Sequence, residues 1–245
     1  MRLMRINSGQ QAPMAAARPL TRFVGRVTTS TEVTDPTPLP VTPPARAVRP
    51  VLLVHGLRGL TSGWYEVAGA LRARGETVVM LSYRPFAQTV EEVAERLADT
   101  VGTLLDDTGA DKVHLVGHSL GGVVIAQAFA DGMLTGQVDT VVTVASPFGG
   151  SPWASLLPVG ATVRSLRGGS PLLRRLAVAP APEGVSWLAI SATSDLIVPG
   201  RRSVPPQSTV VNLAVDGIGH RGLLQDPQVV TSIVDALPTY DLVAA

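Results

Sequence analysis

The stretch that most constrains the fold is 112–129, where an apolar run rich in β-branched residues is followed by an apolar run of helical character. Between the two runs lies the sequence Gly-His-Ser-Leu-Gly at 117–121, with Gly122 directly after it. This order predicts a buried strand, a tight turn that carries the serine, and a helix. Side chains at positions 117 and 121 would collide with the neighbouring strand and helix, and glycine removes them. Gly122 allows the helix to approach the sheet still more closely.

A serine on such a turn presents its hydroxyl above the sheet, which is the arrangement of a nucleophile elbow. The bare motif occurs often by chance, and the alternative is an ordinary strand, turn and helix whose glycines serve only packing. The strand before the motif and the helix after it supply the context that the elbow requires. Ser119 is therefore the candidate nucleophile, and the motifs described below favour this interpretation.

Composition excludes several classes of protein. The 245 residues fit one α/β domain, and no apolar run approaches the length of a bilayer span, roughly 20 residues. A net charge of +1 gives no electrostatic reason to expect a nucleic-acid partner. The absence of cysteine rules out disulfides, thiolate metal sites and a cysteine nucleophile. No ligand cluster suggests a metal, and we expect neither a metal nor a cofactor.

The first fifty residues differ from the rest. Five arginines and no acidic residue stand in 1–26, and prolines crowd 35–50. A proline-rich segment cannot form a helix or a central strand, so we expect 1–50 to be a poorly ordered or extended lead-in to a domain at 51–245. Arg18 and Pro19 interrupt the only candidate core of a secretory signal. We therefore expect a cytoplasmic protein, while peripheral membrane association or secretion by another route stays open.

Beyond residue 50, short apolar runs alternate with segments of helical periodicity. In 90–105, for example, apolar residues recur with a period near 3.6. Such alternation predicts a parallel sheet with helices on both faces. The expected strands are 51–54, 77–82, 113–116, 138–145, 185–191 and 209–215, and the expected helices are 61–74, 90–105, 119–132 and a last one that starts at Asp226 and Pro227.

Five segments, each at the carboxyl end of an expected strand, resemble the α/β-hydrolase superfamily and, within it, the small bacterial lipases and esterases. They are His-Gly-Leu at 55–57, the elbow at 117–121, Ser-Pro-Phe-Gly-Gly-Ser at 146–151, the run at 191–199 and Gly-His at 219–220. Open parallel sheets bind ligands at this edge, and the superfamily uses the chain order Ser, Asp, His. The resemblance spans about 51–237 and implies an α/β-hydrolase fold with a reduced, mostly parallel sheet of about six strands.

Three side chains are the expected catalytic residues. A serine hydroxyl such as that of Ser119 is a weak nucleophile and needs a base within hydrogen-bond reach. His220 fits best among the four histidines, because it lies in a glycine-bounded loop between the last expected strand and the last helix. Asp195, which the superfamily's pattern places after a strand, would orient His220 and stabilise its imidazolium form. Asp216 competes weakly, since it stands too close to His220 along the chain.

The other three histidines have different expected roles. His114 lies on the strand below the elbow and is expected in or near the core. His118 adjoins the serine but should point away from its hydroxyl, and His55 resembles the structural histidine of the superfamily. We also count His55 and His118 as candidate substrate contacts, together with Phe148, Trp153 and Leu196.

The resemblance further implies an oxyanion hole made of two main-chain N–H groups. One follows the nucleophile, at Leu120, and the other belongs to the loop after the first strand, at Leu57. The sequence at 55–57 matches the His-Gly-apolar form of many lipases and departs from the His-Gly-Gly-Gly form of some esterases.

The segment 149–184 is long for a connection within one domain and interleaves leucines with arginines. The resemblance implies a helical cap or lid over an acyl pocket. A plain pair of packed helices that only covers the core is the alternative, and both stay open.

The function implied by the resemblance is that of a serine carboxylic-ester hydrolase, a lipase or esterase that acts through an acyl-enzyme. An acyltransferase or thioesterase would share the acyl-enzyme and differ in the acceptor. A catalytically silent binding protein of the same fold is the third interpretation. The expected partner is a small-molecule acyl ester or lipid, without nucleic acid, while contact with a lipid interface and the oligomeric state stay open.

Overall fold

The computed structural model describes residues 49–59, 61–156, 160–207 and 209–238. All of these residues belong to one unit, Pro44–Ala245. The expected extension at 1–50 lies outside the described residues, apart from Arg49 and Pro50.

Six parallel strands form the sheet, in the order β2-β1-β3-β4-β5-β6. This arrangement confirms the expected parallel sheet of about six strands. Because every strand runs the same way, the loops that follow the strands all leave from one edge. The strands are β1 (Val51–Val54), β2 (Val78–Met80), β3 (Val113–His118), β4 (Val138–Val144), β5 (Ser186–Ala192) and β6 (Val211–Val215).

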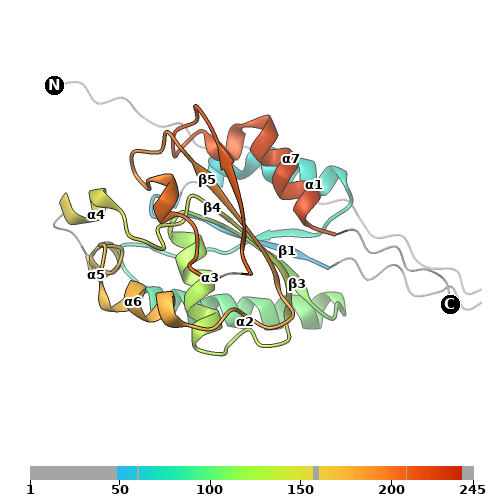
Figure 1. Ribbon diagram of the computed structural model, residues 1–245. Coiled ribbons are helices and arrows are strands. Elements are labelled where there is room, and N and C mark those ends of the chain that lie inside the picture. Colours follow the sequence, from blue (N-terminus) through green and yellow to red (C-terminus); the bar gives the residue numbers. More distant parts are fainter. Residues whose placement is uncertain (1–48, 60, 157–159, 208, 239–245) are drawn as a thin grey trace, which may run out of the picture. The chain divides into compact units, whose positions relative to one another are not determined.

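Helices cover both faces of the sheet (Figure 1). The core residues of α1 (Tyr65–Ala73) and α7 (Pro227–Ala236) pack on one face, and those of α2 (Val90–Thr108) and α3 (Leu120–Ala130) pack on the other. Successive strand residues point to opposite faces, so β1 places Leu52 in one core and Leu53 in the other. Central strands buried on both faces must be apolar throughout, which explains the continuous apolar runs of the sequence.

The amphipathic helix α2 has clear sequence signals at both ends. The side chain of Thr89 accepts from the backbone N–H of Glu92, and the Glu92 carboxylate accepts from that of Thr89. This capping box satisfies two N–H groups that would otherwise lack partners. Gly109, with φ of 66°, ends the helix in the left-handed region.

The segment 149–184 contains three short helices: α4 (Pro152–Leu156), α5 (Ala161–Ser165) and α6 (Pro171–Val178). The leucines of α6 are buried in the core against α3, and Arg175 of α6 pairs with Asp131 at 2.6 Å. In α4, by contrast, Trp153 and Leu156 are exposed. The helix α6 is thus part of the cover of the core, and a lid formed by this segment stays a prediction.

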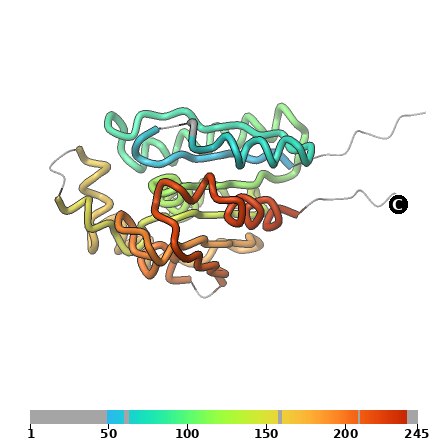
Figure 2. The backbone as a smooth tube through the Cα atoms, turned by 90° about the horizontal axis from the view of Figure 1, so that it is seen from above, coloured from blue at the N-terminus to red at the C-terminus, as the bar shows by residue number. Residues whose placement is uncertain are grey.

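Figure 2 shows the described residues from above. The first described elements (blue and cyan) lie on one side and the last strand region (orange) on the other, with α4 and α5 (yellow) at one end. Three 3₁₀ turns complete the described part: η1 (Thr61–Trp64), η2 (Gly200–Arg202) and η3 (Leu223–Gln225). Within that part, no helix combines the length and the apolarity that crossing a bilayer would demand.

Candidate active site

The turn between β3 and α3 holds Ser119 in an unusual backbone conformation. Its φ is 55° and its ψ is −120°, in a region that residues with a side chain rarely adopt. A Cβ atom on Gly121 would lie 2.1 Å from the carbonyl oxygen of Val54, and one on Gly117 would lie 2.7 Å from the nitrogen of Gly122. The expected reason for both glycines is therefore confirmed, because any side chain would push the serine turn out of place.

Gly122 brings the helix α3 against the neighbouring strand. A Cβ atom at this position would lie 2.1 Å from Oγ of Ser146 and 2.9 Å from Cγ2 of Thr143. Both side chains belong to β4 or to the residues just after it. The helix can approach the sheet this closely only because position 122 has no side chain.

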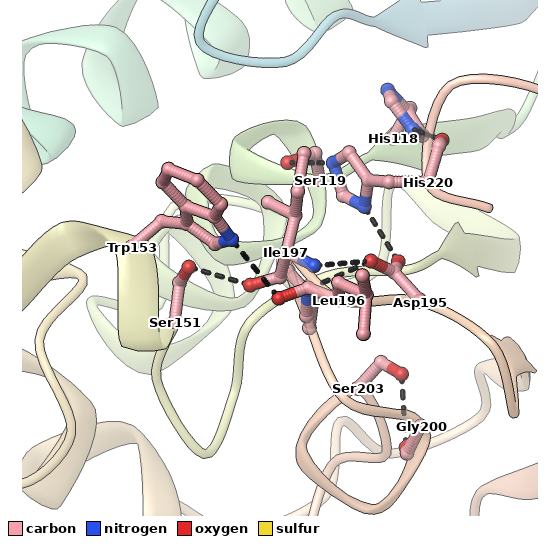
Figure 3. A network of polar contacts seen from close by, with 11 residues as sticks. His118, Ser119, Ser151, Trp153, Asp195, Leu196, Ile197, Gly200, Ser203 and His220 are labelled. Carbon is pink, nitrogen blue, oxygen red and sulfur yellow. Dashed lines mark hydrogen bonds and ion pairs between the residues drawn. The ribbon is translucent and has the colours of Figure 1, made fainter.

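The structure brings Ser119, His220 and Asp195 together above the sheet (Figure 3). Nε2 of His220 lies 3.0 Å from Oγ of Ser119, and Nδ1 lies 2.6 Å from Oδ2 of Asp195. A carboxylate can only accept, so Nδ1 carries the hydrogen and Nε2 presents a lone pair to the hydroxyl. The imidazole is thereby placed to take a proton from the serine.

Asp195 is held by main-chain donors. Its Oδ1 accepts from the N–H of Ile197 at 2.8 Å and of Val198 at 2.9 Å, and its side chain is fully buried. Three hydrogen bonds fix the orientation of this buried carboxylate and keep it facing His220. Asp216 faces elsewhere and accepts from the hydroxyl of Thr193 at 2.7 Å.

Two main-chain N–H groups remain candidates for an oxyanion hole. Leu120 is the first residue of α3, where N–H groups have no partner within the helix. Leu57 lies in the loop after β1 and forms part of the pocket wall beside Ser119. The close approach at Gly56, where a Cβ atom would lie 3.0 Å from Cβ of Ser119, brings this loop next to the serine.

His55 supports the loop after β1 through contacts with Tyr83 and Gly56. Its ring stacks on Tyr83, with centroids 3.9 Å apart and planes inclined by 4°. Its Nδ1 donates to the carbonyl of Gly56 at 2.9 Å, and the hydroxyl of Tyr83 donates to the carbonyl of His55. Burial lowers the pKa of His55 and raises that of Tyr83. The structure thus places this histidine in a supporting position, away from the pocket wall.

The other two histidines occupy opposite ends of β3. His118 lies on the pocket wall, and its Nε2 is 3.3 Å from the carbonyl oxygen of His220. Burial, reinforced by the charge of His220, lowers the pKa of His118 to about 3. His114 is buried at the far end, 3.7 Å from Asp139, and burial lowers its pKa to about 4. His114 therefore lies in the core, as expected.

A cavity of about 650 Å³ opens over the serine and is mostly apolar. Trp153 lies on its wall and is 49% exposed. Other residues that line the cavity are Trp64, Ser151, Ala154, Val163, Leu166, Ile197, Val198, Arg221, Leu224 and Gln225. We call this cavity the serine pocket.

Two further expected substrate contacts lie off the wall of the serine pocket. Phe148 packs edge-on against Trp187, with ring centroids 6.2 Å apart. Leu196 is 81% exposed, and its carbonyl accepts from Nε1 of Trp153 at 3.1 Å. The sequence did not identify Trp64 of η1 or Arg221 of the loop before η3 as wall residues, because only the tertiary structure brings these two segments to the serine.

Among the residues that the structure describes, no group of three or more His, Cys, Asp or Glu side chains is placed to hold a metal ion.

Comparison with known proteins supports the hydrolase fold. The family described as alpha/beta hydrolase fold matches residues 49–162. A triacylglycerol lipase of Pseudarthrobacter phenanthrenivorans is 31% identical over 116 residues, which cover 44% of this chain and 36% of the relative. A triacylglycerol lipase of Burkholderia plantarii is also 31% identical over 116 residues, covering 44% of this chain and 32% of the relative. The aligned stretch thus spans about a third of these curated relatives.

Solved structures show a wider likeness of fold. The mature form of lipase BlEst2 from Bacillus licheniformis superposes with a TM-score of 0.65 at 19% identity, covering 76% of this chain and 90% of that one. Lipase B of Aspergillus fumigatus gives a TM-score of 0.67 at 20% identity, covering 78% of this chain and 52% of that one. The six-stranded parallel sheet, the family match over 49–162 and the likeness to these solved structures show that the chain has the α/β-hydrolase fold.

Proposed function

We propose that this chain is a serine carboxylic-ester hydrolase of the lipase or esterase type. The observation that carries the proposal is the hydrogen-bonded series from Asp195 through His220 to Ser119, which opens into the apolar serine pocket. The series supplies an activated hydroxyl, and the pocket supplies a surface on which an acyl chain can be buried.

In the proposed first half-reaction, Oγ of Ser119 attacks the ester carbonyl carbon while its proton passes to Nε2 of His220. The carbonyl oxygen becomes an anion, which the N–H groups of Leu57 and Leu120 would stabilise. The C–O bond to the alcohol then breaks, and the alcohol leaves with the proton from Nε2. Asp195 stabilises the imidazolium that exists between these two proton transfers.

In the second half-reaction, a water molecule replaces the alcohol. His220 takes a proton from the water, whose oxygen attacks the acyl carbon, and the carboxylic acid leaves as Oγ of Ser119 regains its proton. An alcohol or amine in place of water would make the product a new ester or amide, which is how an acyltransferase would use the same residues.

The serine pocket favours acyl esters as substrates. Its walls on the side of α4 and α5 carry apolar side chains, among them Trp153, Val163 and Leu166. Burying apolar area contributes about 25 cal/mol per Å², so each added methylene of an acyl chain should strengthen binding until the pocket is filled. Two relatives that the chain matches are named triacylglycerol lipase, which supports the same class of substrate.

The test is a series of p-nitrophenyl esters of rising chain length, assayed with the wild type and with Ser119→Ala. We expect hydrolysis by the wild type, and a loss of roughly 10⁴-fold or more in kcat for the variant. Ser232→Ala, on the exposed face of α7, is the matched control and should keep wild-type rates.

A fluorophosphonate probe should label the wild type and not Ser119→Ala. The absence of Ser119-dependent labelling and hydrolysis would favour a catalytically silent binding protein. Faster product formation with an added alcohol than with water alone would favour the acyltransferase interpretation, and faster hydrolysis of a thioester than of the matching oxygen ester would favour the thioesterase interpretation.

A further inference from the structure

The side chain of His118 contacts the main chain of His220. Its Nε2 lies 3.3 Å from the carbonyl oxygen of His220, and the two ring centroids are 4.9 Å apart (Figure 3). A carbonyl oxygen can only accept, so Nε2 of His118 carries the hydrogen and donates it. Within the described residues, this is the only side chain that bonds the main chain of His220.

The main chain of His220 lies in a glycine-rich loop, in which Ile218 packs against the core and Asp216 accepts from Thr193. This loop connects β6 with η3 and contains Gly217, Gly219 and Gly222, which offer no side chains for packing. His118, by contrast, is the last residue of β3, a central strand bonded to β1 and β4 on its two sides. A hydrogen bond from this strand therefore ties a glycine-rich loop to the most constrained part of the sheet.

His118 is itself held in place and kept neutral. Its ring stands edge-on to Trp64, with centroids 6.5 Å apart and planes inclined by 87°. Trp64 is almost fully buried, so the contact is with the core on the α1 side of the sheet. A neutral ring can donate from Nε2 without placing a second positive charge beside the imidazolium of His220.

We propose that His118 is a positioning residue, whose N–H bond to the His220 carbonyl keeps the imidazole of His220 aligned between Ser119 and Asp195. The proposal rests on the proposed hydrolase function. It differs from a substrate-binding role for His118, because a positioning residue affects the chemical step and not substrate affinity. A misplacement of about 1 Å in a catalytic group can cost about a hundredfold in rate.

The test compares His118→Gln with His118→Met. The two replacement side chains have similar length and flexibility, but only glutamine keeps an N–H donor in reach of the His220 carbonyl. We expect methionine to lower kcat for p-nitrophenyl butyrate by about 10- to 100-fold with KM within about twofold. Glutamine should restore kcat to within about threefold of the wild type.

A matched control is His114→Gln, which replaces the buried histidine at the far end of the same strand and should leave kcat unchanged. Thermal unfolding confirms that each variant is folded. Should His118→Met not fold, His118→Phe, which keeps an aromatic ring against Trp64, takes its place.

Three results would overturn the proposal: an unchanged kcat in the methionine variant, a rise in KM at constant kcat, or equal losses in the glutamine and methionine variants. Activity that survives Ser119→Ala would instead overturn the proposed function, so the two failures are distinguishable.

Discussion

Ser119 and Asp195 show how single residues are constrained by their surroundings. The serine has a positive φ, which costs of the order of 1–3 kcal/mol and persists only where neighbouring packing enforces it. The aspartate is fully buried and accepts three hydrogen bonds, two from main-chain N–H groups and one from His220. Both residues therefore have their geometry set before any substrate arrives.

Asp195 and Asp216 should respond differently to replacement by asparagine, because only Asp195 bonds the imidazole of His220. We expect Asp195→Asn to lower kcat by roughly 10³- to 10⁴-fold, because an amide would favour the wrong tautomer of His220 and stabilise its cation poorly. Asp216→Asn, which alters a contact with Thr193 only, should stay within about twofold. Steady-state kinetics on one ester measures both, and equal losses would contradict the assignment of Asp195.

At the scale of elements, the contact between α3 and the sheet depends on glycine. The amino end of α3 approaches β1 and β4 so closely that Gly121 and Gly122 leave no room for a Cβ atom. Gly102 of α2 is different, because nothing lies within 4 Å of a Cβ atom built there. Replacing these helix glycines by alanine should therefore have opposite effects on the stability of the fold.

We expect Gly121→Ala to destabilise the protein by about 2 kcal/mol or more, since the added methyl group would meet the main chain of Val54. Gly102→Ala should stabilise it by up to about 1 kcal/mol, since alanine favours a helix and has room. Urea unfolding gives both free energies. Equal stability of the two variants would show that the close approach of α3 is not as tight as described.

At the scale of the whole molecule, buried histidines couple stability to pH. Burial lowers the pKa of His114 to about 4 and that of His118 to about 3, from an ordinary 6.5. Asp139 opposes the shift of His114, while Arg49 and Arg74 add to it. Between pH 6.5 and 4 the unfolded chain therefore binds more protons than the folded one at these two positions, so they make the folded state less stable as the pH falls.

The resulting prediction is a free energy of unfolding that declines from pH 6.5 towards pH 5, by up to roughly 1.4 kcal/mol per pH unit for each histidine. His114→Gln should make this decline shallower and have no effect on the slope above pH 7.5. Denaturant unfolding at several pH values measures it. An unchanged slope in the variant would mean that His114 has the same pKa in the folded and the unfolded chain, and would contradict the lowered pKa.

Much of this protein was predictable from local sequence patterns. Continuous apolar runs predicted all six strands, and the period near 3.6 predicted α2, because burial on one or two faces dictates which positions along an element are apolar. The glycines at 117 and 121 predicted the serine turn, because their steric reason lies within a few residues of the turn and in the strand beside it. The order of the motifs also predicted that 119, 195 and 220 would meet at one edge, since parallel strands all end there.

Only the tertiary structure decided which side chains form the walls of the site. His55, Phe148 and Leu196 follow strands as the other motif residues do, yet one stacks on Tyr83, one packs on Trp187 and one faces outward. Arg221 joins the wall and His118 reaches the carbonyl of His220 through contacts between segments about a hundred residues apart. A sequence pattern reports burial along one element, whereas the direction of a loop side chain depends on packing against elements that the pattern does not contain.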